Sequence, residues 1–165
     1  MHETPDDLAV LDDLLERSYG SAGHHLRAII TPDRLLDAAE VTRRLTGMRL
    51  LALATVTADG RPLVSPVDGL FFRGRFWFGS GPTSIRLRHI AHRPAVSVTH
   101  TSDQRLVVTV HGTATVVPAG ERAGFDAYAT EVYGSGWQEW GAPAPYARID
   151  PDRMYAATFG DLTDG

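Results

Sequence analysis

The chain contains no cysteine, which excludes disulfide bonds, thiolate metal sites and cysteine nucleophiles. It also contains no lysine, so all 16 basic residues are arginines and Schiff-base chemistry is excluded. No apolar run approaches the roughly 20 residues that a membrane-spanning helix needs. The net charge of -4 argues against a general nucleic-acid-binding protein, which usually has a basic surplus. We therefore expect a globular protein with neither a nucleic-acid nor a membrane partner.

The length of 165 residues corresponds to about one domain with a short appendage. The first seven residues are acidic and polar rather than basic and apolar, as a secretory signal peptide would be, so we expect a cytoplasmic location. Helical signals dominate residues 1–47 and strand signals dominate much of the rest. We expect residues 1–47 to form a helical extension of a main domain over residues 48–165.

Two helices are predicted in the extension. Thr4 is a suitable N-cap, and leucines at helical spacing follow it up to Gly20. A second start signal, Thr31-Pro32-Asp33, predicts a helix that ends at Gly47. The segment between them, residues 21–25, reads as flexible.

The rest of the chain alternates between short strands and turns. An Asp-Gly turn over residues 58–61 joins the first two strands, and two prolines in the second strand place it at a sheet edge or bulge. The last two strands are predicted to form a hairpin around Pro151-Asp152. Residues 134–145 are rich in Gly and Pro and are predicted to be a loop. The predicted strands are 48–57, 62–67, 70–72, 76–78, 95–100, 106–117, 146–149 and 154–159, and the predicted helices are 83–92 and 123–133. This pattern predicts a mainly β fold with flanking helices, a small antiparallel barrel.

A strand, a turn of small residues and a helix follow one another over residues 76–88. The turn supplies the hydroxyls of Ser80 and Ser84, and the first turns of the helix supply Arg86 and Arg88. Hydroxyls, guanidinium groups and a helix N-terminus together suit a phosphate. The alternative is a capped surface helix with solvated arginines.

A second candidate is the proline-interrupted strand around Ser65, Pro66 and Val67. Prolines leave backbone groups of the neighbouring strand unpaired, and these groups could face a planar ligand. The alternative is a sheet edge protected by proline.

The two segments "LATVTADGRPLVSPV" and "GRFWFGSGPTSIRLRHIAHRPAVSV", in this order, resemble the flavin-binding split-barrel family, also called pyridoxamine 5′-phosphate oxidase-like. The resemblance covers Leu50 to about Val117 well and the C-terminal strands loosely. It implies a six-stranded antiparallel split β-barrel over residues 48–165 and a homodimer with the cofactor at the subunit interface.

The resemblance also implies positions for the cofactor. The phosphate-binding run of the family falls on Ser80, Ser84 and Arg86, while Ile85 replaces a basic residue that Arg88 could substitute. Ser65, Pro66 and Val67 would lie along the cofactor ring. No side chain is expected to be catalytic, because the cofactor carries the reaction.

The chain departs from the pattern of true pyridoxamine-phosphate oxidases. Ser65 and Leu70 replace their Arg and Lys on the second strand, and Val107 replaces a Gln. Vitamin B6 oxidation is therefore not expected. The family also includes members that use the deazaflavin coenzyme F-420 and members that bind haem. We expect FMN, or alternatively the deazaflavin, and hydride transfer to or from an unknown small-molecule substrate. The alternative is a non-catalytic flavin- or haem-binding carrier or sensor.

Other residues carry weaker signals. The seven histidines form no zinc-protease motif and no regular ligand spacing, so no metal site is expected. Trp137, Trp140 and Tyr146 either pack in the core or dimer interface, or form an aromatic wall over the cofactor. Arg122 is assigned to a loop and to no site.

Overall fold

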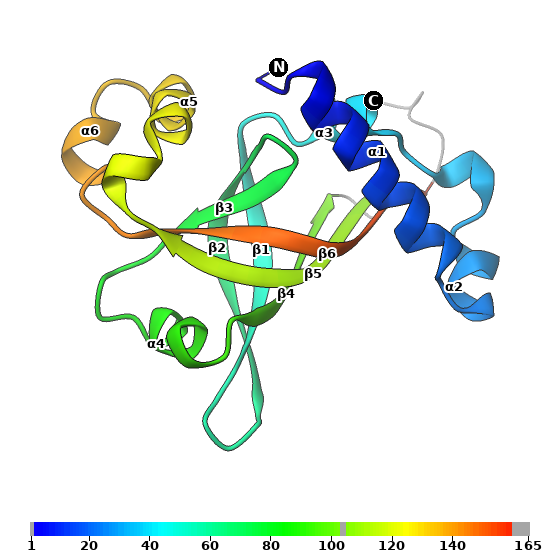
Figure 1. Ribbon diagram of the computed structural model, residues 1–165, viewed down its shortest axis with the longest axis horizontal. Helices are drawn as coiled ribbons and strands as arrows, with labels where there is room; N and C mark the ends of the chain where they lie inside the picture. The colour runs from blue at the N-terminus through cyan, green and yellow to red at the C-terminus, as the bar shows by residue number, and fades with distance from the viewer. Residues whose placement is uncertain (1, 103–104, 160–165) are drawn as a thin grey trace.

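The six strands of the chain close into one antiparallel barrel in the order β1-β2-β3-β6-β5-β4 (Figure 1). A computed structural model describes residues 2–102 and 105–159. The strands are β1 (Met48–Val56), β2 (Pro62–Phe72), β3 (Arg75–Gly79), β4 (Ala95–Ser102), β5 (Leu106–Val117) and β6 (Tyr146–Thr158). The predicted mainly β fold with a six-stranded barrel and flanking helices is confirmed.

The helices cover the barrel from two sides. In Figure 1, α1 crosses the front of β6, while α4, α5 and α6 lie at the opposite side of the molecule. No helix in the described part of the chain is long and apolar enough to cross a membrane. The helices are α1 (Pro5–Gly20), α2 (His24–Ile29), α3 (Ala38–Arg44), α4 (Ile85–His92), α5 (Ala123–Tyr133) and α6 (Trp137–Trp140), with short 3-10 turns at Pro32–Arg34 and Ala119–Glu121.

Helix α1 begins and ends where its sequence predicts. Thr4 and Asp7 form a reciprocal capping box at its start. On its inner face, Leu14 packs into the barrel core, and the buried Ser18 hydroxyl accepts a hydrogen bond of 2.9 Å from the backbone N–H of Met154 on β6. The N-terminal helix is thus attached to the barrel by apolar packing and a buried hydrogen bond.

The prediction of one helix from Thr31 to Gly47 is wrong. Thr31 begins only a 3-10 turn, and α3 begins at Ala38 behind the N-cap Asp37. The chain between them is held in an extended form, because the Leu36 N–H donates to the Ala156 carbonyl and Leu35 bridges to Ala157. Pairing with β6 therefore overrides the local helix signal.

Two strand predictions are also wrong. Residues 62–67 and 70–72 form a single strand β2, because Asp68 and Gly69 continue the pairing with β1. The expected C-terminal hairpin is a single strand β6, which pairs with β5 along its whole length. Its Pro151 lies beside an irregularity in the pairing at His111/Gly112, where proline does not interrupt a ladder.

Alternating side chains of the strands build two cores. On β3, Phe76 and Phe78 face the barrel interior, whereas Trp77 points outward and stacks on Phe125 of α5 at a ring-centroid distance of 4.4 Å. This outer core fixes α5 and α6 against the barrel and places the 134–145 segment beside the ends of β2 and β3.

Candidate functional site

The connection from β3 to α4 gathers two hydroxyls and a guanidinium group. Ser84 is the N-cap of α4 and accepts from the backbone N–H of Leu87. The buried Ser80 hydroxyl donates to the Ser84 hydroxyl over 2.8 Å. The Arg86 guanidinium donates to the Ser80 hydroxyl over 3.3 Å. The predicted N-cap geometry is therefore present, with an arginine in the first turn of the helix.

Arg86 also reaches the second predicted segment. Its other terminal nitrogen donates to the Ser65 hydroxyl over 3.1 Å and to the Pro66 carbonyl over 3.4 Å. The structure thus brings Ser65, Pro66, Ser80, Ser84 and Arg86 into one hydrogen-bonded cluster. The two other predicted residues are not part of the cluster: Val67 is buried next to it on β2, and Arg88 is exposed on α4, where its side chain makes no hydrogen bond or ion pair with the described residues.

The edge of β2 is open where this cluster meets it. Residues 62–68 pair with β1 on one side, but β3 joins the other side only from Gly69 onward. The backbone beside Ser65 and Val67 therefore lacks a second strand partner. Of the two predicted possibilities for the proline-containing segment, a sheet edge or a bulge, the structure shows the edge.

A hollow of about 490 Å³ opens next to the cluster. Such a volume is within the usual range of small-molecule sites, about 300–1,000 Å³. Predicted residues Pro66, Val67 and Arg86 lie in its wall. Its lining consists of Leu50, Pro66, Val67, Asp68, Leu70, Trp77, Gly79, Arg86, Tyr133, Trp140, Gly141, Ala144 and Tyr146.

One wall of the hollow is aromatic. Trp140 and Tyr146 line it, and the fully buried Trp137 lies behind them and donates its indole N–H to the Tyr146 hydroxyl over 3.1 Å. Of the three aromatics singled out in the sequence, one is therefore core and two face the hollow. Gly79 allows this packing, since a Cβ there would lie 2.9 Å from the Tyr146 ring.

Arg122 supports this wall, a role that its sequence position did not indicate. Its guanidinium is buried, lies 5.0 Å from the centroid of the Tyr146 ring and pairs with Asp126 at 3.1 Å. It also donates to the carbonyls of Ala142 and Ala144, which belong to the segment that forms the wall. Arg122 lies, as predicted, in the connection before α5, but no local sequence pattern indicates its buried contacts, because its carbonyl partners lie about 20 residues away in the chain.

The lining of the hollow also contains an acidic and a phenolic group that the sequence analysis missed. Asp68 lies on the outward face of β2, two residues after Pro66, and alternation along the strand is the signal that could have identified it. Burial raises the pKa of Tyr133 to about 12, and the negative charge of Asp68 adds to this rise. Burial also raises the pKa of Tyr146, against the opposing effect of the hydrogen bond from Trp137. Both phenols are neutral at neutral pH.

The histidines do not converge. His89 is buried on α4 and bonds through Nδ1 to the Thr55 hydroxyl at 3.0 Å, and His100 bonds to the Leu50 carbonyl. Within residues 2–102 and 105–159, no group of three or more His, Asp or Glu side chains is placed to hold a metal ion.

Solved structures with the same fold include proteins named for flavin or haem. A FAD-binding protein from Mesorhizobium loti is 25% identical with a TM-score of 0.59, and the alignment covers 76% of this chain and 96% of that one. A FAD-binding protein from Mycobacterium smegmatis is 19% identical with a TM-score of 0.55, and the alignment covers 76% of this chain and 99% of that one. The haem storage protein HutZ from Vibrio cholerae is 22% identical with a TM-score of 0.61, and the alignment covers 77% of this chain and 97% of that one.

No curated protein matches the sequence. The model of the pyridoxamine 5′-phosphate oxidase family matches residues 38–158. This range includes every strand of the barrel and all five residues of the hydrogen-bonded cluster around Arg86, called the Arg86 cluster below. The match confirms the resemblance on which the cofactor positions were predicted, and the chain belongs to the pyridoxamine 5′-phosphate oxidase family.

Proposed function

We propose that the protein is a homodimeric oxidoreductase that binds FMN in the hollow beside Arg86 and transfers hydride to or from a small-molecule substrate. The observation that carries this proposal is the Arg86 cluster, in which the guanidinium lies between the Ser65 and Ser80 hydroxyls at the start of α4. The deazaflavin coenzyme F-420 is the alternative cofactor, because its phosphate would use the same donors.

The residues present fit a phosphate. Ser80 and Ser84 offer hydroxyls, Arg86 offers a guanidinium, and α4 directs its first free N–H groups to the same place. A helix N-terminus favours an anion, and a charge-assisted bond is stronger than a neutral one. The names of the FAD-binding relatives agree with a flavin as the ligand.

The hollow also fits a planar ring. The open edge of β2 beside Ser65 and Val67 offers backbone groups to the polar edge of the ring, and Trp77 and Tyr146 offer apolar surface. A bound flavin or deazaflavin supplies the hydride chemistry. The chain's own residues bind and orient it, and the 134–145 segment excludes water from one side.

A haem carrier is the second candidate, since one relative is named a haem storage protein. Among the described residues, the lining of the hollow includes no His or Met to ligate iron. Its tyrosines are poor ligands, because the pKa of Tyr133 is raised to about 12 and the Tyr146 hydroxyl is bonded to Trp137. These features favour the flavin over haem.

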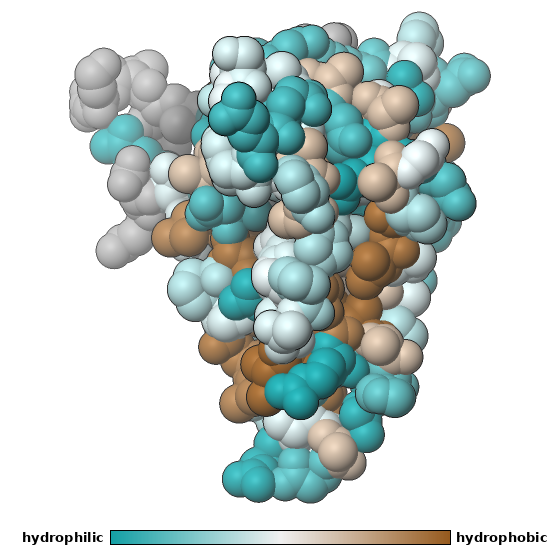
Figure 2. All heavy atoms as spheres, turned by 90° about the vertical axis from the view of Figure 1, so that its left-hand side faces the viewer, coloured by the Kyte–Doolittle hydropathy of each residue, from teal (hydrophilic) through white to brown (hydrophobic). Residues whose placement is uncertain are grey.

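The dimer is proposed from an exposed apolar strip on the outer faces of β1 and β2. Leu50 is 60% exposed and Val64 is 69% exposed, and Leu50 also belongs to the lining of the hollow. Figure 2 shows hydrophobic residues gathered in the middle and lower part of the side that carries α4, α5 and α6. Exposed apolar patches of this kind mark interaction sites, and a second copy would cover the strip and narrow the hollow. Sedimentation should give a dimer for the wild type and a folded monomer for Val64→Glu; a monomeric wild type at micromolar concentration refutes the dimer.

The cofactor is tested by titrating purified protein with FMN, riboflavin, F-420 and haem, followed by absorption and fluorescence. We expect FMN or F-420 to bind roughly tenfold or more tightly than riboflavin, which lacks the phosphate. Absence of flavin and deazaflavin affinity refutes the proposal. Turnover with reduced nicotinamide or reduced deazaflavin then separates an oxidoreductase from a carrier.

A further inference from the structure

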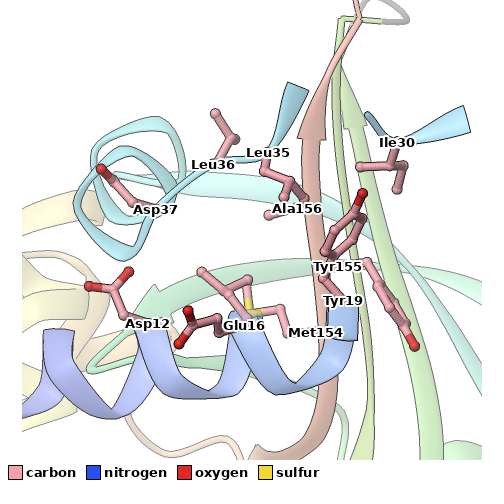
Figure 3. Close-up of a pocket in the computed structure, with 11 residues that line it drawn as sticks. Asp12, Glu16, Tyr19, Ile30, Leu35, Leu36, Asp37, Met154, Tyr155 and Ala156 are labelled. Atoms are coloured by element: carbon pink, nitrogen blue, oxygen red, sulfur yellow. The ribbon is translucent and has the colours of Figure 1, made fainter. Parts of the chain in front are cut away.

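A second hollow, of about 460 Å³, lies on the opposite side of the molecule from the Arg86 cluster. It is enclosed by α1, by the segment 30–37 and by β6, and it shares no lining residue with the proposed cofactor site. Its apolar floor is formed by Leu36, Met154 and Ala156, and Figure 3 shows Met154 beside α1. This volume and this floor suit a small ligand with an apolar body.

The rim of this hollow is negatively charged. Asp12 and Glu16 lie one turn apart on α1, and Asp37 faces them from the opposite wall (Figure 3). No Arg or His lies among the described lining residues. Like charges at this helical spacing repel each other, and no cation of the hollow relieves the repulsion.

Two of the carboxylates already have structural partners and one does not. Asp12 accepts from the backbone N–H of Ala38 over 2.7 Å, and Asp37 caps α3 through the N–H of Glu40 over 2.8 Å. Within the described residues, no hydrogen bond or ion pair is found for Glu16. Glu16 is therefore the carboxylate available to a ligand.

The opposite end of the hollow is aromatic. The rings of Tyr19 and Tyr155 stand beside it in Figure 3. Aromatic faces attract cations, as carboxylates do. The carboxylates are not gathered for a metal, because no group of three ligating side chains in the described residues could hold one ion. The charge is spread around an apolar floor instead, which matches an organic cation.

We propose that this hollow binds a small organic amine, with its ammonium group against Glu16 and its hydrocarbon body on Leu36 and Met154. The hydrocarbon body of the ligand would shield the ion pair between the ammonium group and Glu16 from water. Its own burial on the apolar floor would add to the affinity. An amine bound here would not compete with the cofactor for contacts, because the two hollows have no lining residue in common.

The test uses three probes of one shape and different charge: hexylamine, hexanol and hexanoate. Binding is followed by amide chemical shifts of the full chain, which report both affinity and location. We expect hexylamine to bind roughly tenfold or more tightly than hexanol, and hexanoate not to bind. The largest shifts should fall on the second half of α1 and on Met154 and Tyr155. Equal binding of the three probes, or shifts confined to the Arg86 hollow, overturns the proposal.

Two variants sharpen the test. Glu16→Gln should lower the affinity for hexylamine roughly three- to fivefold, the range expected for the loss of one partly exposed ion pair. Glu139→Gln on α6 is the control and should leave the affinity for hexylamine unchanged. Leu35→Arg places a tethered guanidinium at the rim and should abolish hexylamine binding, although Leu35→Ala should retain it. Wild-type affinity in both Glu16→Gln and Leu35→Arg overturns the proposal, and unchanged amide spectra far from the hollow verify that each variant is folded.

Discussion

The Arg86 guanidinium donates a hydrogen bond of 3.1 Å to the hydroxyl of Ser65, which lies 21 residues earlier in the chain. The bond joins the first turns of α4 to the open edge of β2. It holds the guanidinium in place, so that little side-chain freedom remains to be lost when an anion binds. The same bond explains why two separate segments of the sequence contribute to one site.

We expect Arg86→Ala to weaken FMN binding roughly 10- to 150-fold. A hydrogen bond to a charged group contributes about 1.5–3 kcal/mol, and each 1.4 kcal/mol is about a factor of ten in affinity. Riboflavin should bind wild type and variant about equally, because it lacks the phosphate. Calorimetric or fluorescence titration of both ligands against both proteins measures the effect.

Two further arginine variants serve as comparisons. Arg153→Ala removes an exposed arginine of β6 that lines neither hollow and should leave FMN affinity unchanged. Arg88→Ala tests whether the exposed Arg88 supplies a second cation when FMN is bound. If Arg86→Ala binds FMN as tightly as wild type, the segment 80–88 is only a capped helix and the proposed site is wrong.

Much of the fold could be predicted because its signals are local. The N-cap Thr4, the Arg73-Gly74 turn with positive φ at both residues, and the stop of α4 before Pro94 each depend on a few adjacent residues. The Ser80–Ser84 N-cap of α4 is of the same kind, which is why the core of the candidate site was found. Alternation of apolar residues similarly identified the long strand β5.

The rest depends on contacts between distant segments. Pro151-Asp152 suggests a turn locally, but pairing with β5 keeps β6 extended through it. Arg122 looks like a loop arginine, and only the fold brings the carbonyls of Ala142 and Ala144 to it. Asp68 and Tyr133 become neighbours of one hollow only when α5 packs against the barrel. No local pattern carries such information.

We expect Gly112→Ala to lower the free energy of unfolding by about 1–3 kcal/mol, the usual cost of overpacking a well-packed site. A Cβ at Gly112 would collide with the backbone carbonyl of Asp150 and lie 2.9 Å from Cα of Pro151, and neither can move without breaking the β5–β6 pairing. Gly120→Ala is the matched control, since nothing lies within 4 Å of its added Cβ. Urea unfolding of both variants measures the difference, and equal stabilities would contradict the described pairing at the bulge.

The raised pKa of Tyr133 predicts a decline of stability in alkali. Its pKa is about 12 in the folded protein and 10.0 in a free phenol, with burial as the main cause. The unfolded chain therefore loses this proton first, and the contribution of Tyr133 to stability is complete below pH 10.0 and is lost as the pH rises toward about 12. Tyr133→Phe should make the loss of stability in alkali smaller. It should not remove it, because Tyr128 and Tyr146 also have raised pKa values and lose their contributions to stability as the pH rises. Unfolding of wild type and Tyr133→Phe at several alkaline pH values, together with an ultraviolet phenolate titration, tests this prediction. Identical dependence of stability on pH in the two proteins would contradict it.

The last prediction concerns Arg122, which we expect to affect both the fold and the cofactor site. Arg122→Ala leaves Asp126 and the carbonyls of Ala142 and Ala144 without their partner, and breaking a buried ion pair from one side costs about 3–5 kcal/mol. Arg122→Lys keeps the positive charge beside Asp126 but lacks the planar guanidinium group, whose two terminal nitrogens donate to two different carbonyls. We therefore expect the lysine variant to recover part of the stability and still bind FMN more weakly than wild type, because the Tyr146 wall is no longer held. Urea unfolding and FMN titration separate the two effects; if Arg122→Lys is destabilised yet binds FMN normally, Arg122 supports the fold but does not position the site.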